Sequence, residues 1–280
     1  MLPINWNTAL QYANLIQLAY SILPTNDENA LTTQLAPLGY DYLQTIYANE
    51  LATDIDPHIG EIVSFGFLAV SKTTKELIAI IRGTETIAEW MHDASFLMVP
   101  SPISGIHGFT EDGFTAVYRS LRVARDPDAL CARDAIKNYL HDGTATCVTV
   151  CGHSLGAALA TLLTVDVAIN TPCNSPISYT YASPRVGDHF FAGSYSAVVP
   201  ATYRIANRQD LVPKLPSTLP LPYEHVNTEY ELIPPAGKFD QSVLCMHIIA
   251  SYIWLIKSQA GIATGDVDAK CAYKAEAFKL

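Results

Sequence analysis

The pentapeptide Gly152-His153-Ser154-Leu155-Gly156 follows directly on the apolar run Cys147-Val148-Thr149-Val150-Cys151. The run predicts a buried strand, and the apolar, proline-free residues 157–167 after the pentapeptide predict a helix. A G-x-S-x-G sequence between a strand and a helix is typical of a sharp turn that exposes its serine hydroxyl above the sheet. Its glycines leave room for neighbouring chain packed against the turn. The stretch therefore predicts a nucleophile at Ser154, with the Leu155 amide directed toward a negative oxygen beside it.

The composition is that of a globular chain with a substantial core. The chain has 280 residues, of which 49% are hydrophobic, enough to bury such a core. No linker, charge block or internal repeat divides it, so we expect a single domain over residues 1–280. A formal net charge of −10 argues against binding to nucleic acid and against electrostatic docking on anionic membranes.

Neither the cysteines nor the N-terminus identifies a compartment. The six cysteines include no C-x-x-C and no metal-ligand spacing; an even number permits disulfides, with Cys173 and Cys271 as candidates, but we favour reduced thiols. The apolar stretch from Val243 to Ile256 is too short to span a bilayer, so we expect no transmembrane segment. Residues 1–6 show no basic region leading into an apolar segment, which predicts a cytoplasmic protein or a processed secreted form.

Hydrophobic periodicity predicts strands that alternate with helices. The expected elements are a helix over 7–23, strands over 62–70 and 76–81, a helix over 113–140 interrupted near Pro127, strands over 177–181, 201–205 and 226–232, and a helix over 247–257. Polar residues 72–75 between the first two strands favour a hairpin. This order predicts an α/β fold with a mixed sheet.

A serine nucleophile needs a base and an orienting acid, and several candidates follow Ser154. Asp210 comes directly after a predicted strand, where α/β sheets build their sites, but a turn aspartate that binds its own backbone has the same pattern. Asp166 lies within the helix after the serine. His225 precedes a predicted strand, and His247 begins an apolar helix. Spacing does not choose among them, because only proximity in the folded chain counts.

Four sequence blocks, taken in order, resemble the class 3 (fungal-type) triacylglycerol lipase family of α/β-hydrolases, over about residues 65–255. Ile81-Arg82-Gly83-Thr84 is similar to the family's oxyanion-loop R-G-[ST], and residues 152–160 to its nucleophile elbow. Residues 179–188 resemble its T-Y-G-x-P-R-V-G-N strand and turn, from which Ala182 and Asp188 depart. Residues 204–216 resemble its R-[VI]-x-N-x-x-D-x-V-P-x-L-P sequence. Each block is ordinary alone, but four in this order are specific.

The resemblance implies an α/β-hydrolase fold, with a central mixed, mostly parallel sheet flanked by helices and a short lid helix. It implies that Ser154 attacks an ester carbonyl, that His247 takes the serine proton, and that Asp210 orients His247. His225 matches a histidine that is usually structural in the family. No metal and no organic cofactor is required.

The resemblance also assigns an oxyanion hole. The developing negative oxygen would lie between the amides of Thr84 and Leu155, with the Thr84 hydroxyl as a further donor. A threonine in a turn at the end of a strand is the other interpretation of Thr84. His153, although inside the pentapeptide, is expected to pack or to hydrogen-bond rather than to react.

A lid is expected over about residues 84–93, which resemble the family's short amphipathic lid helix. Its apolar face would carry Ile87, Trp90 and Met91, with acidic residues mostly on the other face. Such a face suits a helix that closes over a pocket or meets lipid, although a helix packed permanently on the core would have the same sequence pattern. The family's H-x-G-F block after the lid departs here, because Glu111 replaces the histidine.

These features together predict a serine carboxylic-ester hydrolase, and foremost a lipase that cleaves acylglycerol esters at an oil–water interface. A short-chain or feruloyl esterase of the same fold is an alternative, although Trp90 favours the lipase. A catalytically silent lipase-like binding protein is another, which the intact Ser154, Asp210 and His247 disfavour. Acyl transfer to an alcohol other than water would share the same acyl-enzyme.

Overall fold

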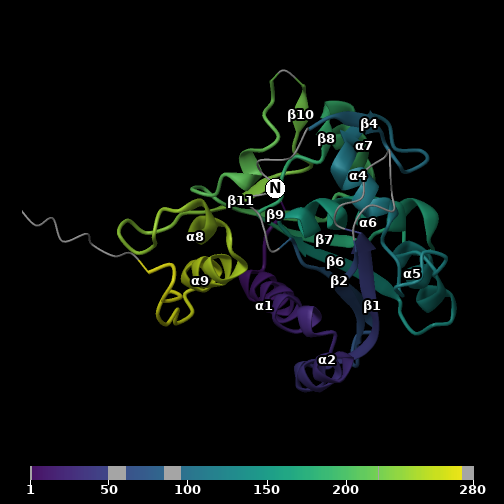
Figure 1. Ribbon diagram of the computed structural model, residues 1–280, viewed down its shortest axis with the longest axis horizontal. Coiled ribbons are helices and arrows are strands. Elements are labelled where there is room, and N and C mark those ends of the chain that lie inside the picture. The colour runs from purple at the N-terminus through teal and green to yellow at the C-terminus, as the bar shows by residue number, and fades with distance from the viewer. Residues whose placement is uncertain (1, 50–60, 85–95, 220, 273–280) are drawn as a thin grey trace, which may run out of the picture.

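The computed structural model describes residues 2–49, 61–84, 96–219 and 221–272. A seven-stranded sheet in the order β1-β2-β3-β6-β7-β9-β11 forms its centre (Figure 1). The strands of this sheet are β1 (Tyr40–Asn49), β2 (Ile62–Ser71), β3 (Glu76–Ile81), β6 (Cys147–His153), β7 (Ile177–Tyr181), β9 (Thr202–Asn207) and β11 (Glu229–Leu232). The expected lid, including Ile87, Trp90 and Met91, lies outside the described residues apart from Thr84.

The central sheet is mixed and mostly parallel, as predicted. Strands β1, β2 and β3 pair antiparallel, so the predicted hairpin is confirmed. From β3 through β6, β7 and β9 to β11 every pairing is parallel. The carboxyl ends of these five strands therefore meet at one edge of the sheet, which is where open α/β sheets place their sites.

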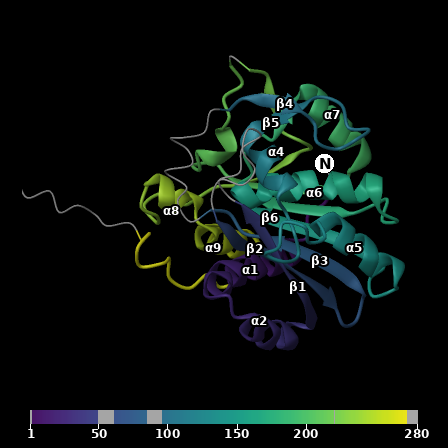
Figure 2. The ribbon, with the colours of Figure 1, turned by 45° about the vertical axis from the view of Figure 1, so that its right-hand side comes forward.

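Helices cover both faces of this sheet (Figures 1 and 2). They are α1 (Trp6–Ile22), α2 (Glu28–Leu35), α4 (Asp112–Arg119), α5 (Ala132–His141), α6 (Leu155–Asn170), α7 (His189–Val198), α8 (Val243–His247) and α9 (Ile249–Gln259). Along β3, Leu77 and Ile81 face a core shared with α4 to α7, while Ile78 and Ile80 face a core shared with α1, α2, α8 and α9. This alternation places a strand buried on both faces between two helical layers.

Helix α6 explains why the sequence after Ser154 is apolar throughout. Its residues from Leu155 to Val167 are all buried, so the helix lies inside the molecule rather than on its surface. A helix buried on all sides needs no polar face.

Two predicted helices have different boundaries in the structure. The helix expected over 113–140 is two helices, α4 and α5, separated by residues 120–131. Within this connection Arg122 forms isolated bridges with Tyr47 and Cys131, so tertiary pairing replaces the helical hydrogen bonds. The helix expected over 247–257 is confirmed as α9 but begins two residues later, because His247 ends α8, and Ile248, at φ −56° and ψ 144°, separates the two helices.

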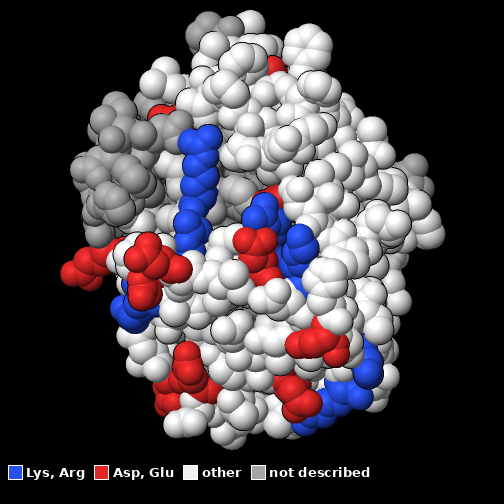
Figure 3. Space-filling view, turned by 90° about the vertical axis from the view of Figure 1, so that its right-hand side faces the viewer, with Lys and Arg blue, Asp and Glu red and all other residues white. Residues whose placement is uncertain are grey.

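A small antiparallel sheet lies apart from the central one, in the order β10-β8-β5-β4. Its strands are β4 (Met98–Pro100), β5 (Phe109–Glu111), β8 (Gly187–Asp188) and β10 (Tyr223–Glu224). It brings the chain after residue 95 next to the turn before α7. None of the described helices is long and apolar enough to cross a bilayer. On the face in Figure 3, basic and acidic side chains stand beside one another within a largely uncharged surface.

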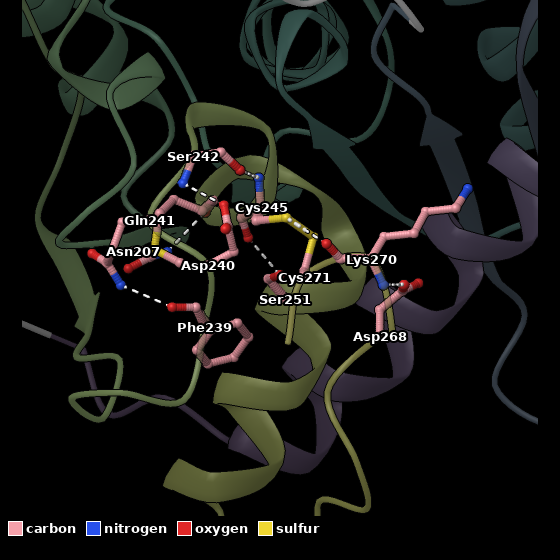
Figure 4. The surroundings of a disulfide bond; sticks show 11 residues. Asn207, Phe239, Asp240, Gln241, Ser242, Cys245, Ser251, Asp268, Lys270 and Cys271 are labelled. Carbon is pink, nitrogen blue, oxygen red and sulfur yellow. Dashed lines mark hydrogen bonds between the residues drawn. A yellow bond between two sulfur atoms is a disulfide. The ribbon is translucent and has the colours of Figure 1, made fainter. Parts of the chain in front are cut away.

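One disulfide corrects the expectation of reduced thiols. Cys245 in α8 is bonded to Cys271, 26 residues further on, whereas Cys173 is a free thiol. Two hydrogen bonds to backbone carbonyls also hold the segment around the disulfide. The Asp240 amide donates to the Cys271 carbonyl at 2.8 Å, and Ser251 Oγ donates to the Cys245 carbonyl at 2.6 Å (Figure 4). The end of the described chain is thus tied to the short helix that ends at His247.

Candidate active site

The predicted nucleophile sits on a strained turn. Strand β6 ends at His153, Ser154 adopts φ 59° and ψ −128°, and α6 begins at Leu155. A positive φ is unfavourable for a residue with a Cβ, and such strain is concentrated at functional sites. Ser154 is 1% exposed, and its Oγ has no hydrogen-bond partner among the described residues.

The glycines of the turn are required by close backbone packing, as predicted. A methyl group on Gly156 would clash with the carbonyls of Ile81 and Arg82, and one on Gly152 with the carbonyl of Gly156. The end of β3 therefore lies directly against the turn. A methyl group on Gly83 would come within 2.8 Å of Ser154 Cβ, so the predicted oxyanion loop lies beside the serine.

Asp210 makes both a local turn contact and a contact with His247. Its Oδ1 accepts a hydrogen bond from the Val212 amide at 3.0 Å, which is the local turn contact. Its Oδ2 accepts from His247 Nδ1 at 2.9 Å and from the Tyr252 hydroxyl at 2.8 Å. The carboxylate is fully buried, so these donors take the place of water.

One ring nitrogen of His247 contacts Asp210. A neutral ring that donates from Nδ1 to this carboxylate keeps a lone pair on Nε2. That Nε2 is buried and has no partner among the described residues. Buried polar atoms without partners are rare, and each calls for an explanation such as a ligand or a reaction. Ser154 Oγ is also among these atoms, and Ser154 follows His153, whose ring centroid lies 4.7 Å from that of His247.

Tyr252 of α9 is a site residue that the sequence analysis missed. Its hydroxyl donates to Asp210 and accepts from the Asn207 amide at 3.0 Å. Burial, reinforced by the Asp210 charge, raises the pKa of Tyr252 well above its usual value, so the hydroxyl stays protonated as a donor. In sequence it is one more aromatic residue of an apolar helix.

His153 links three segments of the site. Its Nδ1 lies 2.8 Å from the Tyr20 hydroxyl and its Nε2 lies 2.8 Å from the His247 carbonyl oxygen. Burial, and to a lesser extent the proximity of His247, holds the pKa of His153 well below its usual value. His153 is therefore a neutral, hydrogen-bonded side chain, in keeping with the expectation that it does not react. Tyr20, from α1, was not identified from the sequence.

His225 and Glu111 have structural partners. His225 Nε2 donates to the Pro213 carbonyl at 2.6 Å, and burial lowers the pKa of His225 to about 3. Glu111, in the departing block, caps α4 by accepting from the Phe114 amide at 2.7 Å. Burial raises the pKa of Glu111 to about 7, even though the amides of Phe114 and Gly113 oppose the shift.

A cavity of about 360 Å³ opens beside His247. Its wall is formed by α1, Thr84 after β3, the end of β6, α8, the start of α9 and the chain before Cys271. The lining residues are Gln17, Tyr20, Thr84, His153, Leu244, His247, Ile248, Ile249, Ala250 and Asp268. The predicted oxyanion residue Thr84 thus shares a cavity with the predicted base, and Leu155 begins α6 next to Ser154. No cluster of three or more metal-binding side chains occurs in the described parts of the chain.

Comparison with known sequences agrees with this geometry. The profile of the Lipase (class 3) family matches residues 78–219. Phospholipase A1-II 7 of rice (Oryza sativa subsp. indica) is 29% identical over 220 residues, 68% of this chain and 53% of the relative. Secreted mono- and diacylglycerol lipase A of Penicillium cyclopium is 33% identical over 173 residues, 61% of this chain and 52% of the relative. The chain spans about half the length of these curated relatives.

Solved structures share the fold. A lipase from Rhizopus microsporus var. chinensis matches 81% of this chain and 74% of its own with a TM-score of 0.64, at 24% identity. A mutant form of MDLA from Penicillium cyclopium matches 61% of this chain and 59% of its own with a TM-score of 0.51, at 32% identity. The fold is the α/β-hydrolase fold of these fungal lipases, as predicted. Since the family profile spans half of the chain, this protein belongs to the class 3 lipase family.

Proposed function

We propose that this protein is a serine carboxylic-ester hydrolase that cleaves acyl esters of glycerol. The observation that carries the proposal is the arrangement around His247, whose Nδ1 is bonded to the buried Asp210 while its Nε2 is left without a described partner. Ser154 Oγ, on the strained turn, is likewise buried and has no hydrogen-bond partner among the described residues. A nucleophile, a base and an orienting acid are the groups that acyl transfer requires.

The proposed reaction proceeds through an acyl-enzyme. Ser154 Oγ attacks the ester carbonyl carbon while its proton passes to His247 Nε2, and the carbonyl electron pair moves onto oxygen. Asp210 stabilises the imidazolium, and the amides of Thr84 and Leu155, with the Thr84 hydroxyl, stabilise the oxyanion. The intermediate expels the alcohol, which takes the proton from Nε2. Water then attacks the acyl-enzyme, gives its proton to Nε2, and Oγ regains that proton as the fatty acid leaves.

The names of the relatives support a glycerol ester as substrate. The relative from Penicillium cyclopium is named a mono- and diacylglycerol lipase, and the rice relative a phospholipase A1. Both names describe the cleavage of an acyl ester on a glycerol backbone. We therefore propose acylglycerols as the first substrate class and glycerophospholipids, on the strength of the rice relative, as the second.

We propose further that residues 84–93 form a lid whose apolar face carries Ile87, Trp90 and Met91. A lid of this kind would exclude water from the charged intermediate and would open when its apolar face meets lipid. The chain over residues 1–280 would act as one domain, because the two cores of the described residues share a single sheet.

Hydrolysis of an ester series tests the proposal. The series contains emulsified mono-, di- and triacylglycerols, phosphatidylcholine vesicles, p-nitrophenyl butyrate and methyl ferulate, with Ser154→Ala as the control. Release of fatty acid from a glycerol ester, abolished in the control, is the expected result. Activity confined to p-nitrophenyl butyrate or methyl ferulate would favour the esterase alternative, and inactivity on every ester would favour the binding protein.

A further inference from the structure

The hydroxyl of Tyr20 lies between the predicted oxyanion loop and the nucleophile turn. It accepts a hydrogen bond from the Gly83 amide at 2.7 Å and lies 2.8 Å from His153 Nδ1. A methyl group on Gly83 would come within 2.6 Å of the same hydroxyl and 2.8 Å of the His153 carbonyl. The three segments therefore meet with no room for a side chain between them. Tyr20 belongs to α1, outside the residues 78–219 that match the family profile.

Chemistry fixes the direction of every hydrogen bond in this chain of contacts. The His247 carbonyl only accepts, so His153 Nε2 must carry a proton. Because His153 is neutral, its Nδ1 is then an acceptor, and the Tyr20 hydroxyl must donate to it. The hydroxyl oxygen accepts the hydrogen bond from the Gly83 amide. The order runs from the Gly83 amide through Tyr20 and His153 to the backbone of His247, without an alternative proton arrangement.

These contacts orient the predicted oxyanion donor. Arg82 Nη1 donates to the Gly83 carbonyl at 2.9 Å, and Arg82 is itself buried and held by the Ser64 carbonyl at 3.1 Å. The Gly83 carbonyl and the Thr84 amide belong to one planar, trans peptide group, so they point in opposite directions. With the Gly83 amide held by Tyr20 and its carbonyl by Arg82, the direction of the Thr84 N–H is set from both sides.

We infer that Tyr20 is a positioning residue of the active site, which aligns the Thr84 amide with the oxyanion and, through His153, the backbone of His247 with Ser154. The inference rests on the proposed ester hydrolysis. Tyr20 is neither the nucleophile nor the base nor the acid of the proposed reaction, and it exchanges no proton in it. Its effect is on preorganisation, because an oxyanion donor contributes only where it already points at the developing charge.

Tyr20→Phe tests the inference, because it removes the hydroxyl and keeps the ring. Tyr12→Phe is a matched control, since Tyr12 lies on the same helix, is more buried, and donates its hydroxyl to Glu76 at 2.9 Å, away from the site. The maximal rate of p-nitrophenyl butyrate hydrolysis is divided by the concentration of serine that paraoxon titrates, which gives a kcat for correctly folded protein alone.

We expect Tyr20→Phe to lower this kcat about 10- to 100-fold, less than the loss of a whole oxyanion donor, with KM within about twofold. Tyr12→Phe should keep kcat within about twofold of the unmodified chain. His153→Phe, which fills the ring position but makes neither hydrogen bond, should show a similar loss and serves if Tyr20→Phe does not fold.

Two results would overturn the inference: a kcat per titrated serine in Tyr20→Phe that equals that of the unmodified chain, or an equal loss in Tyr12→Phe. Failure of the proposed function has another signature. In that case the unmodified chain itself hydrolyses no ester and reacts with no paraoxon.

Discussion

Asp210 Oδ2 lies 2.9 Å from His247 Nδ1, and the two residues are 0% and 3% exposed. They are 37 residues apart in sequence. Asp210 lies in the loop after β9, and His247 ends α8. A carboxylate in that position holds the imidazole in the tautomer whose Nε2 can accept a proton, and it stabilises the imidazolium that results. The remaining donors on Asp210, from Val212 and Tyr252, keep the carboxylate itself in place.

Asp210→Asn should lower kcat by about 10⁴ with little loss of fold, because the amide keeps the shape but favours the wrong histidine tautomer. Steady-state kinetics with a soluble ester measures the effect. Asp166→Asn is the matched control, since Asp166 is also a buried aspartate, bonded to Tyr118 and Asn170 on another part of the molecule. A kcat of Asp210→Asn that equals that of Asp166→Asn and of the unmodified chain would show that Asp210 takes no part in the mechanism.

Tyr252→Phe should reduce the free energy of unfolding by about 1–3 kcal/mol, because it leaves the buried Asn207 amide without its acceptor. It should also lower kcat, since Asp210 loses one of the donors that fix it. Urea unfolding and kinetics on the same preparation check both effects. Unchanged stability and unchanged kcat would show that the Tyr252 contact to Asp210 is incidental.

Glu111 should make stability depend on pH. Its pKa is about 7 in the folded chain and close to 4.5 when unfolded, so the folded state keeps a proton that the unfolded state has lost between these values. Stability therefore falls as pH rises from 4.5 to 7. Glu111→Gln removes this dependence and should be more stable than the unmodified chain at pH 8 by about 2–3 kcal/mol, with little difference near pH 4.5.

Urea unfolding at several pH values between 4.5 and 8 tests the role of Glu111, with the exposed Glu224→Gln as control. Parallel stability curves for Glu111→Gln and the unmodified chain would contradict burial of the charge as the cause.

Loss of the disulfide should destabilise α8, the helix that carries His247, by releasing it from the chain around Cys271. Cys271→Ser opens a loop of 26 residues, which typically costs about 2–4 kcal/mol of stability. Because Cys245 is two residues from His247, activity should disappear at a lower urea concentration than in the unmodified chain. Substitution of the free Cys147 by Ser should leave the midpoint unchanged. Equal midpoints for both variants would show that the bond contributes nothing.

Trp90→Ala should reduce hydrolysis of long-chain esters by about 10- to 100-fold more than hydrolysis of acetyl or butyryl esters, since a lid contact of about 1–3 kcal/mol is made only by the longer chain. Trp254→Ala, on α9 and packed against Phe239, should affect all chain lengths alike. An equal loss on short and long esters in Trp90→Ala would remove the lid proposal.

The parts of the fold that were predicted correctly are those that depend on the pattern of neighbouring residues in the sequence. The β2–β3 hairpin, strand β6, the glycine-bounded turn and helix α6 each follow from neighbouring residues. The interruption expected near Pro127 does fall between α4 and α5, but its extent over residues 120–131 depends on Arg122 pairing with Tyr47, which lies far away in sequence. The strand β1 and the break at Ile248 likewise carry no strong local signal.

The site divides in the same way. Ser154 could be predicted from its motif, whereas the loop around Gly83, Asp210 and His247 could be predicted only from the family resemblance. Tyr20 and Tyr252 could not be predicted, because a tyrosine on an apolar helix looks the same whether or not its hydroxyl meets a functional group. Hydrogen bonds between segments separated by more than 40 residues decide that question.

Covalent labelling of Ser154 tests the central claim most directly. The intact protein, incubated with an alkyl p-nitrophenyl phosphonate, should gain the mass of one phosphonyl group and release one p-nitrophenol, with the adduct mapped to the peptide containing Ser154. Ser154→Ala should not react, His247→Ala should react far more slowly, and His225→Gln should react like the unmodified chain. An adduct on another residue, or equal labelling of Ser154→Ala, would contradict the assignment of Ser154 as the nucleophile.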